Sequence, residues 1–145
     1  MSEAAVDPAS MVSYDGGCHC GNVSYTAKLP SPIQDQVVNT CNCSICSING
    51  YILVYIKKPD LTFHNRDDAA KEYRFGSKRF PHYFCPNCGT SVYASADDIE
   101  GEYAGITAIN ILLSTSSELI WHQGRTLKGV DINSLKIEQL DGKKI

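Results

Sequence analysis

The sequence has no surplus of basic residues and no long apolar run, and each absence excludes a class of function. Lys and Arg together number 13 against 16 Asp and Glu, so the formal net charge is −3. Binding to nucleic acid or to an anionic membrane surface depends on clustered positive charge, so we expect neither partner. The longest apolar-rich stretch, Tyr51–Ile56, has the length of one strand, whereas a membrane-spanning helix needs roughly 18 apolar residues. We therefore expect no membrane segment.

A secretory signal is also missing from the start of the sequence. The first ten residues include acidic residues and lack the basic and apolar regions that define such a signal. They are small, polar and without pattern, so we expect a disordered tail over 1–10 and a single domain over 11–145. Without a signal, the expected location is the cytoplasm, which is a reducing compartment.

Short strands are the secondary structure that the remaining residues favour. No segment longer than about ten residues repeats its apolar residues at the helical period, although Ser44–Asn49 is compatible with one helical turn ended by Gly50. Segments rich in β-branched or aromatic residues, bounded by turn-forming residues, predict strands at 23–27, 36–40, 51–56, 61–64, 72–75, 82–84, 91–94 and 105–112. The expected fold class is therefore mostly β.

Cysteine is the residue type that stands out. Seven cysteines occur, and every one lies within three residues of another, at positions 18, 20, 41, 43, 46, 85 and 88. An odd number excludes a complete set of disulfides. In a reducing compartment, clustered thiols are more often metal ligands or catalytic groups than disulfide partners. The spacing therefore indicates metal binding.

The first and the last pair of cysteines are suited to hold one metal ion together. In an extended segment, the side chains of Cys18 and Cys20 point to the same side, and glycines flank them. Cys85 and Cys88 belong to a C-x-x-C-G turn, in which Gly89 can adopt a positive φ. The two pairs supply four sulfur ligands, the closed tetrahedral set typical of structural zinc.

The other cysteines lie within six residues of one another. Cys41 and Cys43 would share a face of a strand, and Cys46 follows after one turn. Three protein ligands are typical of catalytic zinc, whose fourth position stays open to water or substrate. Thiolate ligands suit such an ion to hold an incoming thiol as thiolate. Other divisions of the seven cysteines into four and three remain open, including one that places Cys41 with the Cys85 turn. A purely structural role for all seven cysteines also remains open.

Taken together, three motifs resemble the glutathione-dependent formaldehyde-activating enzyme family, which also contains the centromere protein V-like proteins. The matching residues are Gly17–Gly21, Cys41–Cys46 and Phe84–Thr90, in that order and at matching intervals. The sequence is most similar to the short fungal-type members, in which Asn-Gly-Tyr and an apolar strand follow the three cysteines, as at Asn49–Tyr51. The resemblance extends from about residue 14 to about residue 125.

This resemblance implies a fold, two metal ions and an activity. The fold would be Mss4-like, with short antiparallel strands organised around a structural Cys₄ zinc. The activity would be that of a carbon–sulfur lyase, in which glutathione adds reversibly to formaldehyde to form S-(hydroxymethyl)glutathione. The resemblance places a structural Zn²⁺ on Cys18, Cys20, Cys85 and Cys88, and a catalytic Zn²⁺ on Cys41, Cys43 and Cys46.

Two other functions stay open at this point. The same site could act on a different small molecule in a biosynthetic pathway, or the domain could be a non-catalytic, zinc-stabilised interaction module. Family members often carry Lys or Arg just after the third cysteine, where it could meet glutathione carboxylates, whereas Ser47 and Ile48 follow it here. Tyr51 is the best candidate to line a pocket. His82 is expected to be a hydrogen-bonded structural residue, with a proton shuttle beside the metal region as the alternative.

Overall fold

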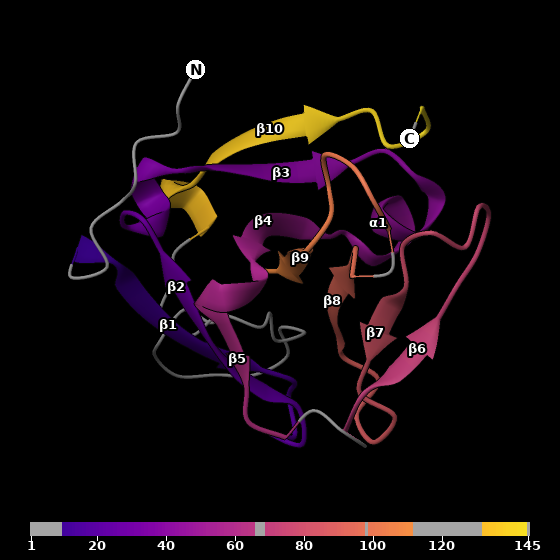
Figure 1. The fold of residues 1–145 in the computed structure, drawn as a ribbon, viewed down its shortest axis with the longest axis horizontal. Helices are drawn as coiled ribbons and strands as arrows, with labels where there is room; N and C mark the ends of the chain where they lie inside the picture. Colours follow the sequence, from indigo (N-terminus) through magenta and orange to yellow (C-terminus); the bar gives the residue numbers. More distant parts are fainter. Residues whose placement is uncertain (1–9, 66–68, 98, 112–131, 145) are drawn as a thin grey trace.

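Short strands, nearly all antiparallel, form two sheets in the computed structural model of the protein, which describes residues 10–65, 69–97, 99–111 and 132–144 (Figure 1). The smaller sheet has the order β1-β2-β5 and the larger one the order β10-β3-β4-β9-β8-β7-β6. The strands are β1 (Val12–Gly17), β2 (Ser24–Leu29), β3 (Val37–Cys41), β4 (Ile52–Lys57), β5 (Leu61–Phe63), β6 (Lys71–Tyr73), β7 (His82–Phe84), β8 (Ser91–Ser95), β9 (Ile106–Asn110) and β10 (Lys136–Leu140). The expected mostly β class is confirmed.

The helical segments whose bounds are described are short. Helix α1 (Ser44–Asn49) follows β3 and ends at Gly50, whose φ of 62° is left-handed. The short 3₁₀ segments are η2 (Ile33–Asp35), η3 (Lys58–Asp60) and η4 (Ile132–Ser134). In the part of the chain that the structure describes, no helix is long and apolar enough to cross a membrane.

The core lies between the two sheets. From the smaller sheet, Tyr25 on β2 is almost fully buried, and its ring meets that of Phe63 on β5 at a centroid distance of 5.9 Å. Phe63 in turn packs on Tyr93 of β8 in the larger sheet, at 4.6 Å. These aromatic contacts join the sheets, and aliphatic residues of β4 and β9 complete the core. Burial of this apolar surface is the main stabilising term of such a fold.

Strand β4 is buried along one face and at Leu53 on the other, where Tyr55 is exposed. Ile52, Val54 and Ile56 belong to the main core, as the strand period of two requires. Leu53 points to the opposite face and packs in a second, smaller apolar cluster with Cys46 and Tyr51. This second cluster is where the cysteines of α1 meet the larger sheet.

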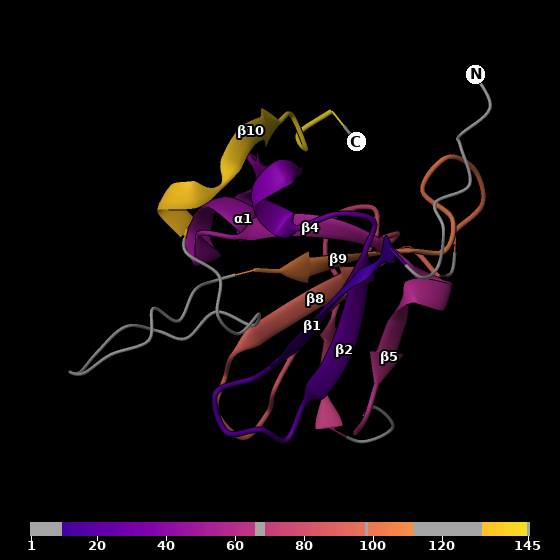
Figure 2. The same cartoon turned by 90° about the vertical axis from the view of Figure 1, so that its left-hand side faces the viewer.

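Two strands escaped the sequence-based prediction. Strand β1 contains Asp15 and two glycines, which are poor strand formers, and β10 is exposed along nearly its whole length. Both are held by pairing with a better strand, β1 with β2 and β10 with β3. Strand β10 runs parallel to β3, with Leu140 opposite Cys41. It forms the outer edge of the larger sheet and lies beside α1 (Figure 2).

The expected extended conformation around Cys18 and Cys20 is wrong. The β1–β2 connection is a tight turn, in which the Gly21 N–H donates to the Cys18 carbonyl oxygen at 3.2 Å and Gly21 has a φ of 83°. A left-handed residue after Cys20 reverses the chain, and glycine adopts that conformation without steric cost. The two sulfurs are therefore brought together by a turn and not by a shared strand face.

Candidate metal centres

Cys18, Cys20, Cys85 and Cys88 form the first group, which we call the quartet. Cys18 and Cys20 come from the β1–β2 turn, and Cys85 and Cys88 from the β7–β8 turn. The four Sγ atoms all lie within 4.8 Å of one another, with Cys18 and Cys20 at 3.5 Å and Cys20 and Cys85 at 3.6 Å. Tetrahedral zinc with Zn–S bonds of about 2.3 Å would separate its sulfur ligands by about 3.8 Å. The quartet therefore fits a tetrahedral ion.

Backbone hydrogen bonds shape the second turn of the quartet. The Gly89 N–H donates to the Cys85 carbonyl oxygen at 2.8 Å, and the Cys85 N–H donates to the Thr90 carbonyl oxygen at 2.9 Å. Gly89 has the expected positive φ, at 73°. In the first turn, the Val23 N–H donates to Cys18 Sγ at 3.2 Å. Donors aimed at sulfur stabilise thiolate charge in a partly buried site.

The thiols of the quartet differ in acidity. Burial raises the pKa of Cys18 to about 12, although the Val23 N–H opposes the shift. At Cys88 burial acts in the same sense, but it is outweighed by hydrogen bonds from the hydroxyl and the N–H of Thr90, and the pKa falls to about 5. The Thr90 hydroxyl lies 3.2 Å from Cys88 Sγ. Because metal coordination deprotonates a thiol outright, an ion here would override the difference.

Cys41, Cys43 and Cys46 form the second group, which we call the trio. Cys41 is the last residue of β3, Cys43 is the N-cap of α1, and Cys46 lies on the helix itself. Their three Sγ atoms also lie within 4.8 Å of one another. The structure thus places Cys41 with its sequence neighbours and not with the Cys85 turn. The seven cysteines gather into one group of four and one of three, and the ions that each group would hold stay a prediction.

Local hydrogen bonds hold the trio in this arrangement. The Ser47 N–H donates to the Cys43 carbonyl oxygen at 3.0 Å, which starts the helix, and the Tyr51 N–H donates to the Cys46 carbonyl oxygen at 3.0 Å, which ends it. The Cys43 N–H also points to Cys41 Sγ, at 3.5 Å. A single helical turn therefore carries Cys46 back toward the two cysteines before it.

Charge cannot spread evenly over the trio. Burial raises the pKa of Cys46, and the neighbouring thiols raise it further. Burial likewise raises the pKa of Cys41. At Cys43 burial is outweighed by the N–H of Cys46 and by hydrogen bonds from both other thiols, so its pKa is lowered. Cys43 is therefore the most acidic thiol of the trio, and three thiolates side by side would need the positive charge of a metal ion.

Aromatic residues line the helix side of the trio. Tyr51 packs against Cys46 and is buried, and its hydroxyl accepts a hydrogen bond from Asn49 Nδ2 at 3.1 Å. Burial raises the pKa of Tyr51, so the phenol is protonated at neutral pH. The Tyr51 ring stacks on His82 at a centroid distance of 6.0 Å. Tyr51 therefore lies next to the trio, and its expected place in the lining of a pocket stays a prediction.

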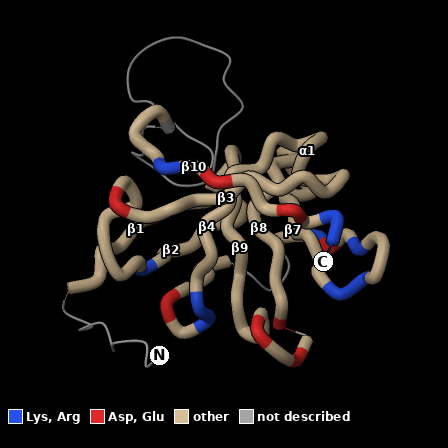
Figure 3. Tube along the Cα trace, turned by 90° about the horizontal axis from the view of Figure 1, so that it is seen from above, with Lys and Arg blue, Asp and Glu red and all other residues tan. Residues whose placement is uncertain are grey.

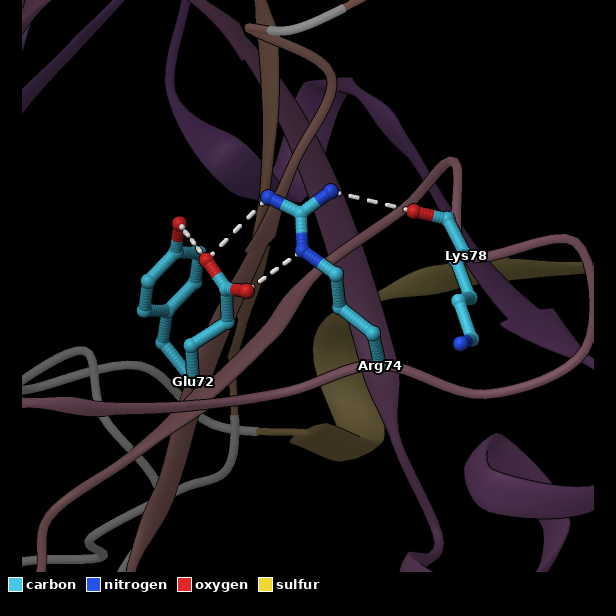
Figure 4. A network of polar contacts seen from close by, with 4 residues as sticks. Glu72, Arg74 and Lys78 are labelled. Carbon is cyan, nitrogen blue, oxygen red and sulfur yellow. Dashed lines mark hydrogen bonds and ion pairs between the residues drawn. The ribbon is translucent and has the colours of Figure 1, made fainter.

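His82 is buried, and its Nδ1 atom has no hydrogen-bond partner among the described residues, so the expected hydrogen bond is absent at this atom. The His82 ring lies 5.6 Å from the ring of Phe75. Phe75 follows β6 in a segment that polar contacts hold in place. The Glu72 carboxylate accepts hydrogen bonds from the Arg74 guanidinium and from the Tyr83 hydroxyl. Arg74 also donates to the Lys78 carbonyl oxygen at 3.0 Å (Figure 4).

The 141–144 turn, which sequence reasoning missed, covers another side of the trio. A Cβ atom added to Gly142 would overlap Cys41 Sγ and lie 3.4 Å from Cys43 Cβ. This turn is about one hundred residues from the trio along the chain, as the Asn42–Asp141 hydrogen bond shows. No local pattern in the sequence could have placed it there.

Comparison with known proteins identifies the family to which these cysteine groups belong. Residues 13–119, which include both groups and more than half of the chain, match the family described as glutathione-dependent formaldehyde-activating enzyme. The chain belongs to this family. The description of the family names formaldehyde activation with glutathione, and both cysteine groups of this member could bind metal.

A solved structure resembles this member of the family. It is the crystal structure of a Rhodobacter sphaeroides protein, a Northeast Structural Genomics target, with 26% sequence identity and a TM-score of 0.56. The alignment covers 67% of this chain and 84% of that chain. The likeness supports a shared fold over that part.

Proposed function

We propose that this protein is a zinc-dependent carbon–sulfur lyase that joins a thiol reversibly to formaldehyde, with glutathione as the thiol. The proposal rests on one observation above all: three sulfur atoms, on the motif that the family match includes, lie close enough to share an ion. Zinc is the metal that such thiolate sets bind in proteins. In this proposal the quartet holds a second zinc ion with a structural role, and the domain extends over 11–145.

The chemistry requires only that a sulfur and a carbonyl carbon meet. A zinc ion on the trio would bind the thiol and supply it as thiolate near neutral pH. The sulfur lone pair forms the new C–S bond, the C=O π electrons move to oxygen, and the oxygen takes a proton to give the S-hydroxymethyl product. In the reverse direction the same C–S bond breaks. The contribution of the protein is proximity and activation of the nucleophile.

Residues around the trio suit a thiol compound that carries carboxylate groups. Cys41, Cys43 and Cys46 would hold the ion, and Tyr51 would line the pocket. Lys143 and Lys144 belong to the turn whose Gly142 lies against Cys41. Basic residues of the segment between β6 and β7 lie on the same side of the molecule (Figure 3). These cations could meet carboxylates of glutathione in place of the basic residue that Ser47 replaces.

Metal content and exchange kinetics test the proposal together. Protein purified without chelator should contain two zinc ions per chain, and Cys43→Ala should retain one and keep its fold. Because formaldehyde and thiols also combine without an enzyme, the activity is best measured as the ¹³C exchange rate between formaldehyde and its glutathione adduct at equilibrium. The wild type should accelerate this exchange, and Cys43→Ala should reduce the rate to that of the buffer.

Two controls separate catalysis from folding. Ser47→Ala changes an exposed side chain on the same helix and should keep both the metal and the rate. Cys88→Ala removes a quartet ligand and should cost the protein its fold. Full exchange activity in Cys43→Ala would refute the catalytic zinc. One zinc per wild-type chain would favour the alternative, a zinc-stabilised interaction module without catalysis. Two zinc ions without exchange activity would favour a different small-molecule substrate.

A further inference from the structure

Strand β10 brings a distant part of the chain to the trio. It pairs in parallel with β3, so that both strands end at the same place, with Leu140 opposite Cys41 (Figures 1 and 2). Residues 136–144 lie outside the 13–119 segment that matches the family. The turn that follows β10 is therefore an addition to the matched part of the fold, and it is placed where the first ligand of the trio lies.

Asn42, between the first two cysteines of the trio, makes one hydrogen bond to the end of β10 and two to this turn. Its N–H donates to the Leu140 carbonyl oxygen at 3.1 Å. Its side-chain Nδ2 donates to Asp141 Oδ1 at 2.8 Å, and its Oδ1 accepts from the Lys143 N–H at 3.2 Å. Lys144 closes the turn through an ion pair with Asp141 at 2.8 Å. Hydrogen bonds of Asn42 therefore tie the loop between Cys41 and Cys43 to the 141–144 turn.

Gly142 is required by contact and not by conformation. It is not among the glycines with a positive φ, so its backbone would accept other residues. The restriction comes from Cys41, because any Cβ at position 142 would overlap the sulfur. A methyl group added at position 142 and the Cys41 sulfur cannot both occupy this space, so one of them must move.

We propose that the 141–144 turn is a structural part of the trio centre, with Asn42 and Gly142 as positioning residues. Asn42 holds the loop that carries Cys41 and Cys43, and Gly142 leaves just enough room for the Cys41 sulfur in the orientation that faces the other two. The turn covers this side of Cys41, so an incoming thiol reaches the centre from another side. This inference rests on the proposed function only in taking the trio as a metal site.

Metal affinity measured site by site tests this proposal. The protein is loaded with Co²⁺, whose thiolate charge-transfer absorption reports on the ligands, and the ions are then withdrawn with a chromophoric chelator. In Gly142→Ala the added methyl group competes with Cys41 for space, so affinity at the trio should fall by about tenfold or more. The quartet should keep its affinity, which also shows that the variant folds.

Asn42→Ala provides a second and independent variant. Loss of its two side-chain hydrogen bonds loosens the ligand loop, and affinity at the trio should fall by about fivefold. Asn65→Ala is the matched control, because Asn65 makes one side-chain hydrogen bond, to Ser24 at 3.3 Å, far from the trio in the fold. Lys143→Ala removes a side chain from the turn without touching the Gly142 contact. Both controls should bind two Co²⁺ ions as the wild type does.

The outcomes distinguish this inference from the proposed function. If the wild type binds two ions and both Gly142→Ala and Asn42→Ala bind them as tightly, the turn has no part in the centre and the inference is overturned. If the wild type binds one ion only, the trio is not a metal site, and the proposed function fails together with the inference. Weakened binding at the trio alone, in both variants and in neither control, supports it.

Discussion

We expect His82 to make the stability of the protein sensitive to acid. It is 9% exposed, stacks between Tyr51 and Phe75, and has a buried Nδ1 without a partner among the described residues. Burial lowers the pKa of His82 below the ordinary 6.5, because a charged imidazolium is poorly solvated there. The unfolded chain therefore takes up this proton at a higher pH than the folded one.

The stability of the folded state should consequently fall as the pH decreases below about 6.5, until the folded pKa is reached. His82→Phe keeps an aromatic ring in the stack and removes the titration, so thermal unfolding between pH 7.5 and pH 5.5 should change less than in the wild type. His64→Gln, at an exposed histidine, is the comparison variant, because it removes an imidazole that lies outside the contacts with Tyr51 and Phe75. Equal slopes for His82→Phe and the wild type would contradict this assignment.

The stability of helix α1 depends on the left-handed conformation of Gly50, the residue that ends it. Gly50 has a φ of 62°, and a Cβ there would meet nothing within 4 Å. The cost of a side chain at this position is therefore purely conformational. Gly50→Ala should destabilise the protein by about 1 kcal/mol, the cost of placing an L-residue in the left-handed region.

Urea denaturation measures this change, and Gly50→Asn should lose less, since asparagine tolerates the left-handed region better than alanine. Ser47→Ala, on the exposed side of the same helix, should leave stability within about 0.5 kcal/mol of the wild type. If Gly50→Ala were as stable as Ser47→Ala, the helix end would not be the constraint that the backbone indicates.

The two cysteine groups differ in what they connect across the molecule. The quartet joins the β1–β2 turn to the β7–β8 turn, over sequence separations such as the 65 residues between Cys20 and Cys85. The trio lies within one strand end and one helix, which local hydrogen bonds also hold. An ion bound to the quartet would therefore close a long-range link, whereas an ion bound to the trio would join ligands that are neighbours in the sequence.

Stepwise removal of metal should reveal this difference. Increasing chelator should first release one ion from the three-ligand trio, with little change in far-UV circular dichroism. The second ion should leave the quartet at higher chelator concentration and together with unfolding, because metal binding to the folded state alone stabilises it. Cys43→Ala should show the second step only. Release of both ions in one step with unfolding would show that the trio also supports the fold.

Much of the candidate site followed from the sequence, because its ligands are close together in the chain. The spacing of Cys41, Cys43 and Cys46 allows their sulfur atoms to converge within a single turn. At Cys85, the C-x-x-C-G turn forms with little requirement beyond a glycine at position 89. Strands such as β4 and β8 were predictable from their β-branched and aromatic residues. Local sterics and hydrogen bonding determine all of these features.

Other features were decided only when the chain folded. Strand β10 is exposed and weakly patterned, and it exists because β3 offers it hydrogen bonds. The close approach of Gly142 to Cys41 and the burial of His82 depend on elements that meet across the molecule. Residue pattern alone indicated that Cys41, Cys43 and Cys46 could converge, since a short stretch of backbone has few conformations, whereas the meeting of the Cys18 and Cys85 pairs was decided by the fold. The residues that surround the cysteine sulfurs were decided by long-range packing, since the local residue pattern does not indicate which distant strand a segment pairs with.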